Sequence, residues 1–504
     1  MRIKVIGILV CTFLLGVTET RAENRPAVTP QDLLDAKVFP NGGFGLSVES
    51  AADDPDRAVV VTTGAEFHII KNDDLVECYQ SIGTPRKVAS IRLAKGLAAT
   101  LKLIYQSSGT AVFSGVGGIL RINCDSLLMY QPKSDGDISA ELSFTPDWHS
   151  QFKGSYNFFD PQGGISFFDH GLHPDSTLAA TEDPVKVTWS WKAGEVFWAA
   201  VSPPKIYNWE KSAGYHVAFH GSSEDRYMYL PDISIIRLGR LGVKVLYLHN
   251  EMAWENHQLS LVPKDMANFK RTMDTAHEQG MKVIVYCSPH YYVKGTSLES
   301  KANPDPHKFV GEHTGANEPL YLQQATRVVK EFGADGLYFD EMYPSPESLA
   351  VQYHLTRTSR ELVGDSGPLF LHVSTDVLGN GHLGPVCPPI HTWFDVIYKG
   401  EGEWNRRDPG YTRYVLSSHN TSNAMAVQII DERFAPTGED IDFWLRANVR
   451  FFTPEFYFYT GQINVLKTWY WPRLNADLQR TIEPDLARRT GVFEQARKLL
   501  PKDE

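Results

Sequence analysis

Acidic side chains that could exchange protons with a substrate follow two short apolar segments of this chain. Asp340 and Glu341 come directly after the run from Gly336 to Phe339, and Glu401 and Glu403 follow a second apolar run. One carboxylic acid can protonate a leaving oxygen while a second carboxylate attacks carbon or activates water, which is the pairing that glycosidic hydrolysis uses. The two segments therefore predict a pair of reacting carboxylates, provided that the fold brings their ends together.

The alternation of side chains along a strand distinguishes Asp340 from Glu341. Tyr338 and Asp340 would share one face of the strand, and Leu337 and Phe339 would share the other with Glu341. The apolar pair suits a layer beneath helices, so we expect Asp340 to point into the mouth of the fold and favour it as the reacting carboxylate. The alternative is that Asp340 caps the loop or pairs with an arginine.

Other polar and aromatic residues lie after neighbouring predicted strands, and they are densest between residues 249 and 257. Sugars are held by planar hydrogen-bonding groups together with aromatic faces, so these residues are candidates for substrate binding. Asp431 also competes with Glu401 for the role of proton donor, and a lone His372 is equally a satisfied core residue. The candidate binding residues are His249, Asn250, Glu251, Trp254, His290, Tyr338, Glu341, His372, Trp404 and Asp431.

A metal site formed by His249, Glu251 and His257 is the competing hypothesis for that dense segment. Neither an HExxH spacing nor the Cys and His spacing of a zinc site supports it. The chain also lacks GxSxG, Walker and GxGxxG patterns in a strand-to-helix setting. We therefore predict an enzyme without a cofactor. A metal-dependent hydrolase or deacetylase and a non-catalytic carbohydrate-binding barrel are the alternative functions.

Strands that alternate with helices after about residue 204 would position these side chains. A helix followed by glycine and then a strand recurs at Gly242, Gly280 and Gly333, and we expect Gly333 to end its helix in the left-handed conformation. Eight strands with intervening helices predict a (β/α)8 TIM barrel, in which Asp340 follows the fourth strand and Glu401 the sixth. The expected strands are Lys205 to Asn208, Val243 to Leu248, Lys282 to Tyr286, Gly336 to Phe339, Leu369 to Val373, Val396 to Tyr398, Ala424 to Ile430 and Phe456 to Tyr459.

The preceding part of the chain, residues 23–203, has a different pattern. Short runs rich in Val, Ile, Phe and Tyr, such as Ala58 to Thr62 and Val185 to Trp191, are separated by clusters of Gly and Asp. This pattern is typical of an antiparallel β-sandwich. The predicted fold is thus an all-β sandwich followed by an α/β barrel over residues 204–504, with a helical tail from about Pro484 to Leu500.

The first residues are typical of a signal peptide. Arg2 and Lys4 precede an apolar run from Val5 to Val17, and Thr20-Arg21-Ala22 offers a cleavage site after Ala22. The run is too short to span a bilayer as a stop-transfer helix. We therefore expect export, to the periplasm or the medium, without membrane attachment after cleavage.

Charge and cysteine content bear on partners and compartment. The formal net charge of -11 gives no electrostatic reason to bind nucleic acid or anionic lipid, so a carbohydrate substrate is the expected partner. Cys78 and Cys124 could pair in an oxidising compartment or remain two separate buried thiols. The sequence makes no prediction of oligomeric state.

With these residues the chain resembles the α-galactosidase-like clan D glycoside hydrolases, secreted enzymes that join an N-terminal β-sandwich to a (β/α)8 barrel. The resemblance rests on the segment Gly333 to Asp340 (GADGLYFD) and the segment Ile397 to Glu401 (IYKGE). It implies that Asp340 is the nucleophile and that Glu401 or Glu403 is the acid/base, with retention through a covalent glycosyl intermediate. The clan usually has Asp after the sixth strand where this chain has Glu, and it usually adds a C-terminal β domain that we do not find here.

Overall fold

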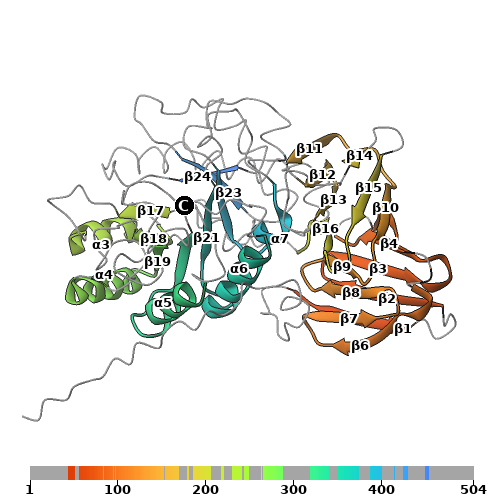
Figure 1. The fold of residues 1–504 in the computed structure, drawn as a ribbon. Helices are drawn as coiled ribbons and strands as arrows, with labels where there is room; N and C mark the ends of the chain where they lie inside the picture. The colour runs from red at the N-terminus through yellow and green to blue at the C-terminus, as the bar shows by residue number, and fades with distance from the viewer. Residues whose placement is uncertain are drawn as a thin grey trace, which may run out of the picture.

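The structure is a computed structural model built around three eight-stranded sheets (Figure 1). It describes residues 44–205 apart from short gaps (51–55, 83–84, 95, 97, 153, 170–178 and 181–184). Beyond residue 205 it describes residues 217–220, 230–240, 243–248, 263, 265–287, 318–339, 349–373, 386–399, 414, 424–428 and 449–452. None of the helices in these ranges is long and apolar enough to cross a membrane.

Two of the sheets are antiparallel and are formed by residues 46–202. Sheet A, in spatial order, contains β1 (Leu46–Ser50), β2 (Arg57–Thr62), β3 (Ala65–Ile70), β4 (Leu75–Gln80), β5 (Arg86–Arg92), β10 (Gly136–Leu142), β15 (Lys186–Trp191) and β14 (Ala179–Ala180). Sheet B contains β11 (Trp148–Phe152), β12 (Ser155–Asp160), β13 (Gly163–Phe168), β16 (Phe197–Ser202), β9 (Leu127–Pro132), β8 (Gly118–Asn123), β7 (Thr110–Ser114) and β6 (Lys102–Gln106). Short 3-10 helices η1 (Lys71–Asp73) and η2 (Ala98–Thr100) lie between strands.

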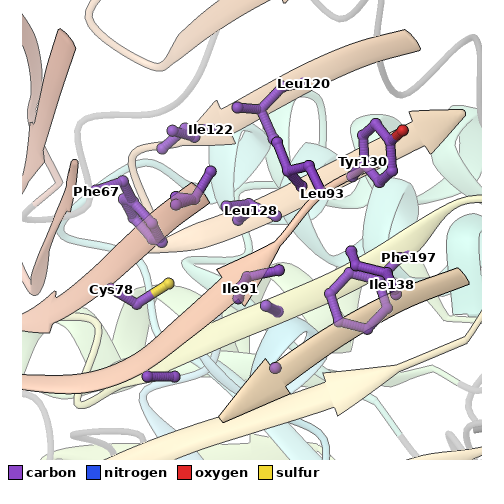
Figure 2. Packing of buried hydrophobic residues seen from close by; sticks show 14 of the residues in the cluster. Phe67, Cys78, Ile91, Leu93, Leu120, Ile122, Leu128, Tyr130, Ile138 and Phe197 are labelled. Atoms are coloured by element: carbon purple, nitrogen blue, oxygen red, sulfur yellow. The ribbon is translucent and has the colours of Figure 1, made fainter. Parts of the chain in front are cut away.

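Sheets A and B share one hydrophobic core, which is the arrangement of a β-sandwich. Alternation along β15 shows how it forms, because Val187, Trp189 and Trp191 are buried while the intervening residues are exposed. Figure 2 shows Phe67 and Cys78 of sheet A packed near Leu128 of sheet B in this core. Two large antiparallel sheets therefore occur where the sequence pattern predicted them.

The inner strands β13 and β16 of sheet B are buried on both of their faces, whereas its edge strand β6 is exposed. Phe158, Ile165 and Phe167 point into the core that is shared with sheet A. The alternate residues also have little exposed surface, with Ser166 at 0% and Trp198 at 2%. This second face lies against helices of the following part of the chain, so its side chains are covered although many of them are polar.

The third sheet, sheet C, is parallel throughout, and its strands follow the order of the chain. Helices lie between its first six strands, as in repeated βα units. The strands are β17 (Val217–His220), β18 (Val245–Leu248), β19 (Lys282–Cys287), β20 (Gly336–Phe339), β21 (Leu369–Val373), β22 (Val396–Lys399), β23 (Ala424–Gln428) and β24 (Val449–Phe452). The helices are α3 (Asp232–Arg240), α4 (Met266–Glu278), α5 (Glu318–Lys330), α6 (Leu349–Val363) and α7 (Pro388–His391).

Local sequence signals explain where several helices begin and end. The side chain of Asp265 caps α4 by accepting the backbone N–H of Asn268 at 3.0 Å. After α5 the chain turns at Gly333, whose φ of 85° is the left-handed conformation that the sequence predicted. Gly280 after α4 has a φ of 70° and serves the same purpose.

The strand count agrees with the sequence analysis, although two positions differ. The first described strand of sheet C is β17, and of the predicted first strand, Lys205 to Asn208, only Lys205 is described, in a bend. The eighth is β24, whereas the predicted segment Phe456 to Tyr459 lies outside the described residues. The described pairings run from β17 to β24 and include none that joins β24 back to β17, so a closed barrel stays a prediction.

Cys78, Cys124 and Cys387 are free and buried thiols. The first two are therefore separate core residues, and the disulfide between them that the sequence left open is not formed. Residues 1–22 and the predicted tail from Pro484 to Leu500 lie outside the described residues.

Candidate active site

The candidate site is the edge of sheet C at which its strands end. All eight strands are parallel, so their carboxyl ends meet at one edge, where α/β proteins usually place their chemistry. Cys287 pairs with Phe339 and Val373 pairs with Lys399, so these neighbouring strands end at the same level. Phe339 pairs with Leu371, so β21 extends two residues beyond β20. The segments that continue from these strands therefore all start at the same edge.

The two faces of β20 have different surroundings. Phe339 lies 5.5 Å from the ring of Tyr321 on α5 and 5.5 Å from the ring of Phe394 before β22. Leu337 and Phe339 are both fully buried. The helix side of β20 thus carries the apolar pair that its alternation predicted, and Tyr338 points to the opposite side.

Tyr338 is the centre of an aromatic row that crosses four consecutive strands, from β18 to β21. Its ring stacks on Tyr247 with centroids 4.1 Å apart and planes inclined by 22°. Tyr286 lies 6.1 Å away on the neighbouring strand β19, and the imidazole of His372 lies 6.3 Å away on β21, the neighbour on the other side. Tyr338 is 2% exposed and His372 is 7% exposed. The row is therefore a packed layer.

The contact between Tyr247 and Tyr338 shows that this face of sheet C is concave. The two residues belong to β18 and β20, which are separated by β19. In a flat sheet such strands lie about 10 Å apart and their side chains run parallel to each other. The rings converge to 4.1 Å, as they do on the inner side of a curved sheet.

A buried ion pair supports the strands from the helix side. Arg360 on α6 contacts the carboxylate of Asp395 with 2.6 Å between Nη2 and Oδ2. The same Oδ2 accepts the backbone N–H of Leu369, the first residue of β21, at 2.9 Å. Arg360 also donates to the carbonyl oxygens of Trp393 and Gly367. One guanidinium group therefore links α6, the start of β21 and the residue that precedes β22.

The structure places two of the predicted site residues, Tyr338 and His372, and brings them together in the aromatic row. Sequence analysis missed Tyr247 and Tyr286, although alternation along β18 and β19 places them on the same face as Ile284 and Val245. The remaining predicted residues lie outside the described residues: Asp340, Glu341, Glu401, Glu403, His249, Asn250, Glu251, Trp254, His290, Trp404 and Asp431.

Within the described ranges, no group of three His, Cys, Asp or Glu side chains could hold a metal ion. The three ligands of the competing metal hypothesis, His249, Glu251 and His257, fall outside those ranges. The described part of the candidate site is thus aromatic and apolar, with one imidazole.

No protein-family model and no curated protein matches this chain. Among solved structures, an α-galactosidase from Lactobacillus brevis has a TM-score of 0.40 and 11% identity over 85% of this chain and 68% of its own. A GH36 α-galactosidase from Geobacillus stearothermophilus in complex with 1-deoxygalactonojirimycin has a TM-score of 0.41 and 9% identity over 89% and 73%. A GH31 dextranase from Flavobacterium johnsoniae has a TM-score of 0.37 and 10% identity over 92% of this chain and 72% of its own. Because these TM-scores are below 0.5, we take no residue role or substrate from them.

Proposed function

We propose that this protein is an exported glycoside hydrolase that cleaves O-glycosidic bonds of oligo- or polysaccharides. Asp340 is its nucleophile, and Glu401 or Glu403 is its acid/base. Residues 1–22 direct export and are removed, residues 23–203 form the sandwich domain, and residues 204–504 form the catalytic domain. Sheet C closes into a (β/α)8 barrel in this proposal, and the concave aromatic row is the observation in favour of closure.

The observation that carries the proposal is the orientation of Tyr338. Its ring lies on the concave face of sheet C, while Phe339 faces α5. Asp340 is the next residue in the chain, two positions after Tyr338. If the alternation of the strand continues for one more residue, the carboxylate of Asp340 points to the concave side, above a dry aromatic floor.

The partner carboxylate follows from the order of the strands. Counted from β17, β20 is the fourth strand and β22 is the sixth. Glu401 comes two residues after Lys399, the last residue of β22, and Glu403 comes four after it. In the fold of a curved parallel sheet, carboxylates after the fourth and sixth strands can reach one substrate from two sides.

The proposed reaction has two steps. Asp340 attacks the anomeric carbon while the glutamic acid protonates the leaving oxygen, which gives a covalent glycosyl intermediate. The same glutamate then takes a proton from water, and the hydroxyl oxygen displaces Asp340 with net retention of configuration. His249, Asn250, Glu251, Trp254, His290 and Trp404 would bind the sugar, with Tyr338 and His372 below it.

The test starts from a screen of aryl glycosides and polysaccharides to find a substrate. We expect Asp340→Asn to lower kcat at least a hundredfold, because the amide cannot form the covalent intermediate. Glu331→Gln is the control, since Glu331 is 59% exposed after α5 and precedes the start of β20 rather than following its end, and it should keep kcat within about threefold. Near-normal turnover by Asp340→Asn would remove Asp340 from the nucleophile role.

The stereochemical outcome is an independent test of Asp340 as the nucleophile. NMR of the first-formed anomer should show retention of configuration. Azide added to Asp340→Ala should restore bond cleavage and yield a glycosyl azide of inverted configuration, because the small anion occupies the space of the missing carboxylate. Inversion by the wild-type enzyme would instead assign Asp340 or its partner as a base that activates water.

A further inference from the structure

A buried polar contact joins the sandwich to the helix that packs beside β20. It is formed by the turn between β8 and β9 and by Tyr353 on α6. Asn123 donates its side-chain N–H to the Tyr353 hydroxyl oxygen at 2.9 Å, and the Tyr353 hydroxyl donates to Oδ2 of Asp125 at 3.1 Å. The phenol of Tyr353 thus contacts two residues, Asn123 and Asp125, that precede it by 230 and 228 positions in the chain.

Asp125 is enclosed almost completely, with 3% of its surface exposed. Its other carboxyl oxygen, Oδ1, has no hydrogen-bond partner among the described residues. Burying an ionised carboxylate with one unsatisfied oxygen costs much more free energy than burying the neutral acid. The site therefore favours a protonated side chain.

The titratable and charged groups around Asp125 come from each element that is packed against it. The turn contributes Cys124, β8 contributes Arg121, and α6 contributes Tyr353 and Arg357. Burial raises the pKa of Asp125 to about 7, against the lowering effect of the Tyr353 hydrogen bond, of a hydrogen bond from the backbone of Asp125 itself and of the two arginines. Arg121 also donates from Nε to the side-chain oxygens of Thr110 and Asn123.

The contact has a route to the candidate site. Tyr353 also packs edge-on against Trp198 of sheet B, with ring centroids 5.5 Å apart. The helix that carries Tyr353 contacts β20 and β21, and its Arg360 pairs with Asp395 before β22. The turn therefore contacts the helix that packs against two strands of the aromatic row.

We propose that Asp125 is a proton-controlled latch, which holds the β8–β9 turn on α6 more tightly in acid than at neutral pH. The docked turn binds a proton that the exposed turn releases, so docking tightens about tenfold for each pH unit below 7, until the exposed carboxyl also becomes protonated near pH 4. Above about pH 7 the docked carboxylate is ionised and the dependence ends. This latch does not depend on the proposed catalytic reaction.

Hydrogen exchange of the full chain at about pH 5 and about pH 8 tests the latch, with labelling times scaled for the intrinsic exchange rate. In the wild-type protein, backbone amides of the β8–β9 turn and of α6 should be about a hundredfold more protected at the lower pH. Asp125→Asn mimics the neutral acid, so its protection should equal that of the acidic wild type at both pH values. Asp147→Asn, at an exposed aspartate, should behave as wild type.

Two results would overturn the proposal. One is equal protection of the wild-type turn at both pH values, and the other is a wild-type pH response in Asp125→Asn. Tyr353→Phe gives a second measurement if Asp125→Asn does not fold. It removes the hydrogen bond that stabilises the carboxylate, so the midpoint of the pH response should move upward. An unchanged or lower midpoint would also contradict the latch.

Discussion

Arg360 and Asp395 form an ion pair with both side chains almost fully buried, at 3% and 5% exposure. We expect Asp395→Ala to lower the free energy of unfolding by about 3 to 5 kcal/mol, because it leaves the guanidinium group buried without its counter-charge. It also removes the acceptor of the Leu369 N–H, which starts β21. Urea denaturation followed by circular dichroism measures this loss.

The control for that prediction is Glu331→Gln at the exposed pair of Arg327 and Glu331. Its atoms are 3.4 Å apart with side chains that are 38% and 59% exposed, so the change should cost less than about 1 kcal/mol. A loss of similar size for Asp395→Ala would contradict the role of Arg360 as the link between α6, β21 and β22.

The raised pKa of Asp125 should make the global stability of the protein depend on pH. Its pKa is raised to about 7 in the folded protein and is near 3.8 when exposed, so between these values the folded state binds more protons. Its contribution to stability is thus present below about pH 4 and is lost as pH rises through 7, by about 4 kcal/mol in total. Chemical denaturation across this range should show a smaller fall for Asp125→Asn than for the wild type. Parallel curves for the two proteins would contradict the assignment.

Gly336 begins β20, and its position leaves no space for a side chain. A Cβ there would lie 1.8 Å from the carbonyl oxygen of Pro368 and 3.1 Å from Ile284. Gly336→Ala should therefore displace the start of β20 and lower the melting temperature sharply or abolish soluble expression. Gly96→Ala is the control, because nothing lies within 4 Å of its Cβ and only its φ of 78° opposes the change. We expect that variant to lose about 1 kcal/mol. Equal losses of stability in the two variants would show that the close contact at Gly336 does not determine the effect of the substitution.

Periodicity in the sequence predicted the parts of the fold that local physics determines. Glycines that end helices, the alternation along β20 and six of the eight strands of sheet C depend on neighbouring residues alone, and Gly336–Phe339 was located to the residue. The sequence analysis did not find β17 and β24, because strands of four residues with one polar side chain, such as β24, have no period of their own. Pairing with β23 selects that segment.

The candidate site was predictable only in part, for a related reason. Alternation placed Tyr338 on the same face as Asp340, but the contact of Tyr338 with Tyr247 depends on the curvature of sheet C. The burial of the second face of sheet B was even harder to predict from the sequence. Its Asn123 has the pattern of a solvent-facing residue, yet it bonds to Tyr353, 230 positions later in the chain.

The aromatic row gives a prediction that separates packing from function at Tyr338. Tyr338→Phe keeps the three ring contacts, so its free energy of unfolding should stay within about 1 kcal/mol of wild type. Tyr338→Leu loses the stack on Tyr247 and should cost about 1 to 2 kcal/mol more. If this row is the floor beneath Asp340, the leucine variant should also lose at least about tenfold in kcat/KM on the substrate found by screening, since a small displacement of a reacting group is costly. Thermal melts and initial rates measure the two effects. A leucine variant with full kcat/KM would place the reaction away from the concave face of sheet C.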